Sequence, residues 1–316
     1  MQVENGFEGI LPAMALPLNE DLTIDRDGLR QFTRWLAGHA GIGGLVTNGH
    51  TGEVFALSPQ ERAQVTATVA AEVAGKLPVI SGICAEGIGE AVEHAKMARD
   101  AGASGLLVMP PHYWLRFGMQ PEHVLDHFSA IGEASGLSLI VHVYPAWTRA
   151  SYSSSLLARL VKLPHIQTVK IGTRELSKYD RDIAAIRASN PSCRILTCHD
   201  EYLLPTMVQG VDGALVGFAS LIPSWIVELY RSVCEGDLRR GQVIQRRINV
   251  LKEAVYADGE PSGDAHARLK TAMMLAGLIG SNRTRPPIRP PVGAMLDRIR
   301  AAVDEAGLLA KASSGH

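Results

Sequence analysis

A lysine lies inside one of the apolar segments of the chain. Lys170 occurs in the run IQTVKIGT, whose other residues are mostly β-branched or small. If its side chain points into a buried interior, desolvation lowers the pKa of the ammonium group and frees the amine as a nucleophile, which can form a Schiff base with a ketone. The alternative is an outward-facing lysine that lies along a helix or pairs with a carboxylate. The spacing alone leaves both interpretations open.

Two polar side chains interrupt another apolar segment, LIVHVYPAWT. His142 and Tyr144 are two residues apart, so in a strand they lie on the same face. A histidine has an unperturbed pKa of about 6.5, which suits it to accept and donate protons near neutrality. The alternative is a hydrogen-bonded core histidine beside a tyrosine that only packs.

A glycine-rich turn is a candidate for binding an anion. In Gly49-His50-Thr51-Gly52, two glycines flank a hydroxyl residue, so that backbone N–H groups can point at an anion such as a substrate carboxylate. The alternative is a tight connection between a strand and a helix that binds no ligand.

Metal ligands are sparse in the sequence. His123 and His127 have helical i, i+4 spacing, but no further ligand pattern accompanies them, and we interpret them as a solvated helix face. The pair His199-Asp200 supplies too few ligands for a metal. We therefore predict no metal site.

Composition excludes several classes of function. The 316 residues include 31 basic and 32 acidic ones, for a net charge of −1, which argues against nucleic acid or an anionic membrane as a partner and favours a small ligand. Four cysteines without a C-x-x-C pair suit a reducing compartment. The N-terminus lacks a signal-peptide pattern and no run reaches the roughly 18 apolar residues of a membrane span, so a cytoplasmic location is predicted.

Short apolar segments alternate with segments of helical periodicity from residue 9 to about residue 236. Helices are predicted to begin at Asp25, at Ser58, where Pro59 follows and Glu61 is in capping-box position, and at Pro121. Eight β-α units in a row predict an α/β fold. They favour a closed (β/α)₈ TIM barrel rather than an open doubly wound sheet. The strand candidates are residues 9–18, 43–49, 78–84, 105–111, 137–144, 166–172, 194–200 and 213–220.

Two units follow from this pattern. Residues 1–236 are predicted to form the barrel, with the active site at the carboxyl ends of its strands. Residues 237–316 are predicted to form a C-terminal helical appendage, and the linker SNRTRPPIRPP within it cannot be a regular helix. The appendage helices are expected at 237–257, 264–280 and 292–310.

The chain resembles the dihydrodipicolinate synthase and N-acetylneuraminate lyase superfamily, the pyruvate-type class I aldolases, over essentially its whole length. The resemblance implies a TIM barrel with a C-terminal helical domain, a homotetramer built from dimers, and an imine between Lys170 and the keto carbon of a 2-keto acid, with no cofactor. The matching segments, in order, are GILPAMALPL, GHTGEVFALSPQER, VMPPHYW, VHVYPAWT, TVKIGT and CHDEYLLPTMVQGVDGALVGFAS.

The same resemblance assigns other site residues. Gly49, His50 and Thr51 would bind the substrate carboxylate, with Thr51 keeping the hydroxyl of the family. Gly217, in the last matching segment, is a further substrate-binding candidate. Tyr113 would reach into the site of a neighbouring subunit and help to relay protons.

Three positions depart from the family pattern. His50 replaces a hydroxyl residue, His142 replaces the phenol at the Schiff base, and Trp147 replaces an arginine that binds a second carboxylate. We hypothesise that His142 and Tyr144 together take over the work of the phenol. Without the arginine, true dihydrodipicolinate synthase activity, that of a 4-hydroxy-tetrahydrodipicolinate synthase, is not expected. Trp147 and Trp114 favour an apolar or aromatic portion on the second substrate.

The leading functional expectation is a Schiff-base-forming lyase, an aldolase or a dehydratase, acting on a 2-keto acid such as pyruvate or a 2-keto-3-deoxy sugar acid. The alternative is a protein with altered or lost catalysis that binds a keto acid as a sensor. A metal-dependent barrel hydrolase is a third possibility, and the histidine spacing argues against it.

Overall fold

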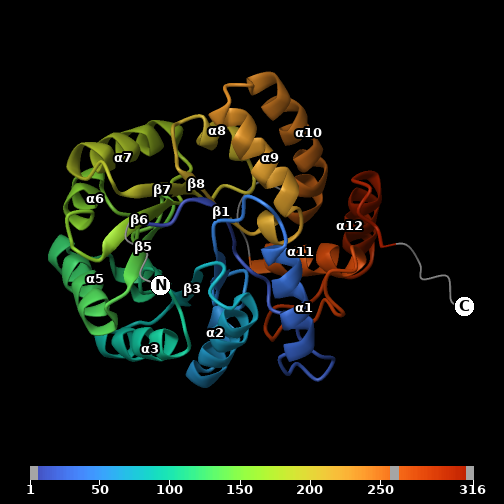
Figure 1. The fold of residues 1–316 in the computed structure, drawn as a ribbon, viewed down its shortest axis with the longest axis horizontal. Coiled ribbons are helices and arrows are strands. Elements are labelled where there is room, and N and C mark those ends of the chain that lie inside the picture. The colour runs from blue at the N-terminus through green and yellow to red at the C-terminus, as the bar shows by residue number, and fades with distance from the viewer. Residues whose placement is uncertain (1–5, 257–262, 311–316) are drawn as a thin grey trace, which may run out of the picture.

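Eight parallel strands form the centre of the molecule in a computed structural model that describes residues 6–256 and 263–310 (Figure 1). The remaining residues, 1–5, 257–262 and 311–316, include the start of the chain and parts of the predicted appendage and lie outside the described residues. The strands are β1 (Gly9–Pro12), β2 (Leu45–Thr47), β3 (Val79–Ile83), β4 (Gly105–Val108), β5 (Ser138–Val143), β6 (Ile166–Ile171), β7 (Arg194–Thr197) and β8 (Gly213–Val216).

The sheet follows the order of the chain and then returns to its beginning. Each strand pairs with the next from β2 to β8, and β8 pairs with β1. Between β1 and β2 the contact consists of isolated bridges, such as Ala13 with Val46, and the Met14 N–H donates to the Val46 carbonyl at 2.9 Å. The predicted (β/α)₈ barrel is therefore confirmed, with strands that end earlier than the apolar runs.

Helices surround the barrel, as Figure 1 shows for α2, α3, α5, α6 and α7. The predicted helix starts are confirmed: Asp25 accepts a hydrogen bond from the Gly28 N–H, Ser58 and Glu61 form a capping box, and Pro121 opens α5. The helices are α1 (Arg26–Ala37), α2 (Pro59–Val73), α3 (Ile88–Asp100), α4 (Tyr113–Phe117), α5 (Pro121–Ser135), α6 (Ser154–Leu160), α7 (Leu176–Ser189), α8 (Leu203–Met207), α9 (Pro223–Cys234), α10 (Leu238–Val255), α11 (Gly263–Leu275) and α12 (Ala294–Glu305), with short 3₁₀ turns η1 (Val54–Ala56) and η2 (Phe218–Ser220).

Apolar side chains fill the interior of the barrel below the strand ends. Phe7 closes the amino-terminal end, and Gly105 leaves room for it, because a Cβ there would lie 2.3 Å from the Phe7 ring. Polar side chains further along the same strands lie between this packed layer and the carboxyl ends of the strands. The interior cluster comprises Phe7, Leu11, Ala13, Val46, Ile80, Leu107, Ile140, Leu196 and Leu215.

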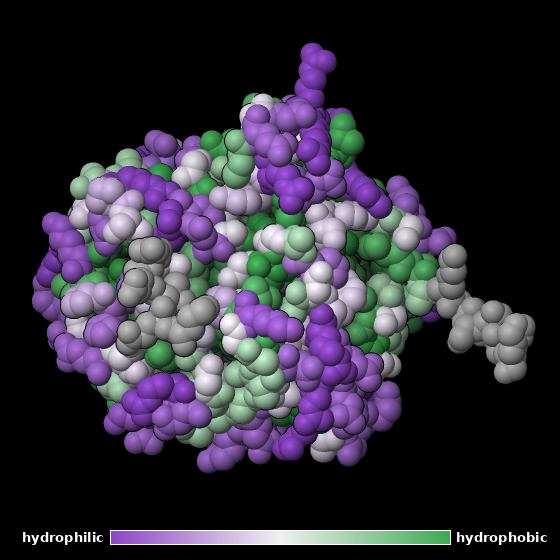
Figure 2. Space-filling model, viewed as in Figure 1, coloured by the Kyte–Doolittle hydropathy of each residue, from purple (hydrophilic) through white to green (hydrophobic). Residues whose placement is uncertain are grey.

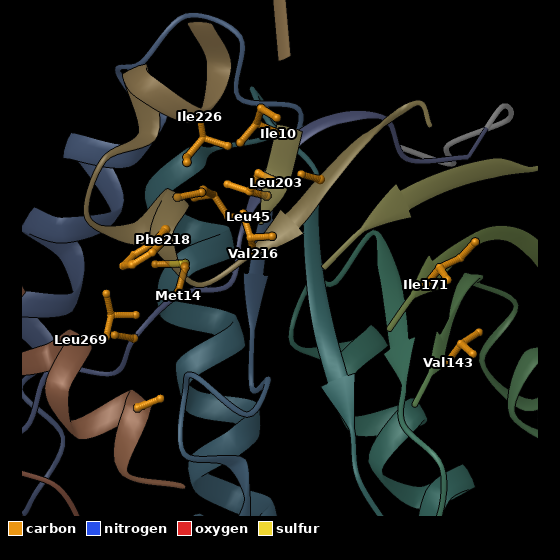
Figure 3. Close-up of a cluster of buried hydrophobic side chains, with 14 of the residues drawn as sticks. Ile10, Met14, Leu45, Val143, Ile171, Leu203, Val216, Phe218, Ile226 and Leu269 are labelled. Atoms are coloured by element: carbon orange, nitrogen blue, oxygen red, sulfur yellow. The ribbon is translucent and has the colours of Figure 1, made fainter. Parts of the chain in front are cut away.

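The C-terminal helices α10, α11 and α12 pack on one side of the barrel (Figure 1), where the sequence predicted an appendage. In Figure 3, Leu269 of α11 lies beside Met14 and Phe218, which follow β1 and β8. Helices α11 and α12 are shorter than expected, and the proline-rich connection between them is irregular. The boundary at residue 236 stays a prediction, since α9 and α10 pack on each other across it.

A buried ion pair ties this C-terminal part to the barrel. The Nζ of Lys270 lies 2.7 Å from Oε1 of Glu53 and also donates to the carbonyl of Arg283. The other oxygen of Glu53 accepts the N–H of Arg285 at 2.9 Å. Both charged side chains are almost completely buried. Loss of either one would leave the other as a buried charge without a partner, which would destabilise the fold.

Hydrophilic residues cover most of the visible face in Figure 2. Within residues 6–256 and 263–310, none of the helices is long and apolar enough to cross a membrane.

The interpretation of His123 and His127 as a solvated helix face is wrong for His127. His123 is exposed, but His127 is only 2% exposed and packs against the rings of Trp114 and Phe128. Four-residue spacing places two side chains on similar sides of a helix, but it does not say where the boundary of the core lies. Burial lowers the pKa of His127 to about 4.

Replacing Lys270 tests the buried ion pair. We expect Lys270→Met to lower the free energy of unfolding by about 3–5 kcal/mol, because Glu53 is left as a buried charge without its cation. The double variant Lys270→Met/Glu53→Gln should recover most of the loss in urea unfolding. As a control, Arg30→Ala breaks the exposed Arg30–Asp27 pair and should cost under about 1 kcal/mol. Equal costs for the two single variants would contradict the role of burial.

The lowered pKa of His127 predicts that the protein loses stability in acid. Its pKa is lower in the folded protein than the value of about 6.5 in an unfolded chain, so the unfolded state binds more protons. Its stabilising contribution is complete above pH 6.5 or so and is lost as the pH falls towards 4, by roughly 3 kcal/mol at most. In urea unfolding from pH 7 to pH 4, His127→Gln should flatten this dependence, whereas His123→Gln should leave it unchanged.

Candidate functional site

A cavity of about 210 Å³ opens at the carboxyl ends of the strands, above the apolar interior layer. The alternation of side chains along β5 and β6 decides what faces it. Ile140 belongs to the interior layer, so His142 and Tyr144 lie on the same inward face further along. In the pairing of β5 with β6, Lys170 is the register partner of His142. The side chains of His142, Tyr144 and Lys170 all line the cavity.

The amine of Lys170 stands at this cavity and does not lie along an outer helix. Among the described residues, its Nζ has no hydrogen-bond partner. Burial lowers the pKa of Lys170 and the nearby Arg174 lowers it further, while Cys198 and Asp200 act in the opposite direction. A desolvated amine with a lowered pKa is the form that attacks a carbonyl carbon.

Three rings form a cluster beside the lysine. The Oη of Tyr144 and Nε2 of His50 lie 3.0 Å apart in a hydrogen bond, and the His142 ring packs edge-on against Tyr144 at 5.0 Å between centroids. Burial, reinforced by Lys170, keeps the pKa values of His50 and His142 well below their usual range. Burial raises the pKa of Tyr144. The cluster thus holds two neutral imidazoles and a protonated phenol, which can accept and donate protons.

The turn after β2 presents backbone donors to the same cavity. In the described part of the chain, the N–H groups of Gly49, His50 and Thr51 donate to no acceptor, and all three residues line the cavity. The turn is held by Asn48, which is in a left-handed conformation and whose amide donates to the Arg62 carbonyl. Unpaired N–H groups on a fixed turn can bind a carboxylate.

Two charged residues of the cavity were missed as ligand contacts. Arg174, just after β6, donates to Glu201 at 2.8 Å and to the carbonyl of Gly172. Asp200, after β7, accepts hydrogen bonds from Gly217 N–H, Phe218 N–H and Tyr256 Oη. Both follow strand ends, so their position in the sequence was a usable signal.

The C-terminal part contributes two further side chains. Tyr256, at the end of α10, and His266, in α11, line the cavity. Burial, together with the smaller effect of Lys170, lowers the pKa of His266 to about 4. No strand precedes these residues, so sequence position gave no reason to consider them. The lining of the cavity therefore includes residues beyond 1–236, the range in which the sequence predicted the active site.

Several predicted residues lie elsewhere or are already engaged. Trp147 is 59% exposed and lines neither this cavity nor a neighbouring one. Trp114 is buried against His127 and lines neither cavity. Tyr113 is 44% exposed and outside the cavity of its own chain, so its role in a neighbouring subunit stays a prediction. Gly217 lines the cavity, but its N–H is bound by Asp200.

The candidate metal pair does not assemble a ligand set. His199 is completely buried, and its ring nitrogens bond to the Thr173 carbonyl and the Thr197 hydroxyl. Within the described ranges, no group of three or more His, Cys, Asp or Glu side chains is arranged to hold a metal ion.

Known proteins are similar to this chain in fold and in sequence. The family model for the Dihydrodipicolinate synthetase family matches residues 6–306. The 4-hydroxy-tetrahydrodipicolinate synthase of Acidiphilium cryptum (strain JF-5) is 34% identical over 307 residues, covering 96% of this chain and 100% of that protein. The structure of a chloride-inhibited dihydrodipicolinate synthase from Acinetobacter baumannii complexed with pyruvate has a TM-score of 0.85 and 26% identity, covering 96% of this chain and 100% of that one. A structure described as the first monomeric dihydrodipicolinate synthase variant has a TM-score of 0.87 and 23% identity, covering 96% and 98%.

These relatives overturn the expectation that the chain is not a true 4-hydroxy-tetrahydrodipicolinate synthase. A protein of that name is 34% identical over nearly the whole chain, which conflicts with the exclusion. The exclusion considered a guanidinium only at the position of Trp147, whereas the folded chain brings Arg174 to the cavity from the segment after β6. The match over residues 6–306, on a barrel of the same architecture, shows that the chain belongs to the dihydrodipicolinate synthetase family.

Proposed function

We propose that this protein is a Schiff-base-forming lyase that acts on a 2-keto acid such as pyruvate through Lys170. The observation that carries the proposal is the amine of Lys170, which has a lowered pKa and, among the described residues, no hydrogen-bond partner, in a cavity that also presents the free N–H groups of Gly49, His50 and Thr51. The pyruvate complex of the Acinetobacter baumannii relative supports this substrate class.

The proposed chemistry is redox-neutral. The Lys170 amine attacks the keto carbon, the carbonyl oxygen leaves as water, and the substrate carboxylate is held by the turn at Gly49 to Thr51. The iminium withdraws electrons, so a proton can leave the adjacent carbon to give an enamine. The enamine carbon then bonds to the carbonyl carbon of an aldehyde, whose oxygen takes up a proton, and water releases the product and the amine. The reverse sequence cleaves the bond, and loss of a hydroxyl as water instead makes the enzyme a dehydratase of a 2-keto-3-deoxy sugar acid.

In this proposal the ring cluster moves the protons. His142 has a buried Nδ1 without a hydrogen-bond partner in the described structure, and it lies next to Lys170 in the register of the two strands. Tyr144 supplies a phenol hydrogen-bonded to His50. The proposal assigns His142 and Tyr144 jointly to the acid–base steps, with His50 holding the phenol in place. A homotetramer remains the expectation for the assembly, although one relative is described as monomeric.

Trapping with borohydride tests the role of Lys170. Incubation with pyruvate and borohydride should give a reduced pyruvyl adduct that peptide mapping places on Lys170. The buried Lys270 is an internal control, since its amine is held by Glu53 and should stay unmodified. Lys170→Arg keeps the charge and should abolish the adduct. If pyruvate and borohydride leave no adduct on the protein, the proposal is wrong. If the adduct forms but the protein neither turns over 2-keto-3-deoxy acids nor forms 4-hydroxy-tetrahydrodipicolinate, the keto-acid sensor is favoured.

Removing the phenol tests the shared proton transfer. We expect Tyr144→Phe to lower kcat by about 10²-fold on any substrate that the enzyme turns over, while pyruvate trapping at Lys170 persists. Tyr152→Phe is a matched control, because Tyr152 is also a buried tyrosine but lies outside the cavity. If Tyr144→Phe turns over normally while His142→Ala is inactive, the two residues do not share the role.

A further inference from the structure

A second, larger cavity of about 400 Å³ adjoins the one that holds Lys170. It lies between the turn η1, the short helix α4, the start of α11 and the proline-rich segment before α12. Its apolar lining comes from Phe55, Leu115, Pro286, Pro287 and Ile288. The two cavities share His50, Tyr144 and His266 as lining residues, so they meet at these side chains.

Phe55 gives this cavity an aromatic face. Its side chain is 55% exposed, although a phenylalanine of the core would be buried. It stacks on His50, with centroids 5.0 Å apart and an interplanar angle of 29°, and lies 4.9 Å from the ring of His112. The hydrogen bond between His50 and Tyr144 joins this face to the ring cluster beside Lys170. An exposed ring held against other rings is a stacking surface for a further ring.

The charged groups around this cavity are bound within the protein. Glu53 accepts hydrogen bonds from Lys270 and from the Arg285 N–H. The guanidinium of Arg285 donates to both oxygens of Glu61 and to backbone carbonyls. His112 lies 3.5 Å from Glu86. The lining thus offers a ligand apolar and aromatic contacts, with its charges already paired.

We propose that the second cavity is a subsite for an apolar, ring-bearing substituent on the carbonyl partner of the keto acid. This subsite proposal rests on the proposed function, in which Lys170 carries the imine. It adds the chemical class of the second substrate, a ring-bearing carbonyl compound, to the keto acid of the proposed function. The keto-acid portion occupies the smaller cavity between Lys170 and the turn, and the ring at the far side of the new carbon–carbon bond lies against Phe55. The relevant product with pyruvate is therefore a 4-aryl-4-hydroxy-2-keto acid.

Imine trapping measures this subsite without requiring turnover. The ligand 2-oxo-4-phenylbutanoate has the carbon chain of such a product but lacks the 4-hydroxyl, so it can form the imine but cannot be cleaved. The ligand 2-oxoglutarate has the same chain ending in a carboxylate in place of the ring. The fraction of protein that carries the borohydride-reduced adduct at Lys170 is followed by mass spectrometry against the concentration of each ligand.

We expect 2-oxo-4-phenylbutanoate to reach half-maximal trapping at a concentration about tenfold lower than 2-oxoglutarate, because only the phenyl group gains from burial in an apolar site. Phe55→Ala should remove this advantage and leave pyruvate trapping unchanged. Phe117→Ala is the matched control, since Phe117 is an exposed phenylalanine on α4 outside both cavities, and it should keep the advantage.

The outcomes separate the two proposals. If pyruvate leaves no adduct on Lys170 in the wild-type protein, the proposed function fails. If pyruvate is trapped but 2-oxoglutarate is trapped at equal or lower concentration than the phenyl ligand, the subsite proposal alone is overturned. The same holds if Phe55→Ala weakens all three ligands equally, or if Phe117→Ala has the same effect as Phe55→Ala.

Discussion

The cost of burying a charge inside a barrel is the constraint on which this site depends. Lys170 lies beyond Ile140 and beside Leu196, both of the apolar interior layer, where an ammonium ion is poorly solvated. The same burial that makes the charged form unfavourable makes the amine available for reaction. It also keeps His50 and His142 neutral. In the proposed function, one physical effect therefore prepares both the nucleophile and the bases around it.

Stability and site geometry meet at the turn after β2. Glu53 ends this turn in a left-handed conformation and is held by Lys270 from α11, while the preceding residues Gly49 to Thr51 direct free N–H groups at the cavity. The C-terminal helices thus hold the turn that contains Gly49 to Thr51 through Glu53, and they supply His266 to the cavity. They act as part of the site and not only as a cover for the barrel.

Periodicity located the inward-facing residues wherever it applied. Along β5 and β6 the alternation of side chains places His142, Tyr144 and Lys170 at one cavity, because every second residue of a strand faces the same way. The same reasoning fails at Trp147, which follows the strand in a loop where no period holds. It also fails at His127, since spacing on a helix does not reveal how far the core extends around it.

The sequence by itself determined the eight β-α units and the helix starts at Asp25, Ser58 and Pro121, because each depends on neighbours within a few residues along the chain. It placed Lys170 in a strand but left open the direction of its side chain, and the role of this lysine came only from the family resemblance. Only the tertiary structure decided which distant side chains meet that lysine. Closure of the barrel brings Arg174 to the cavity, and docking of the last helices brings His266. Such contacts depend on long-range packing, which local propensity and period do not encode.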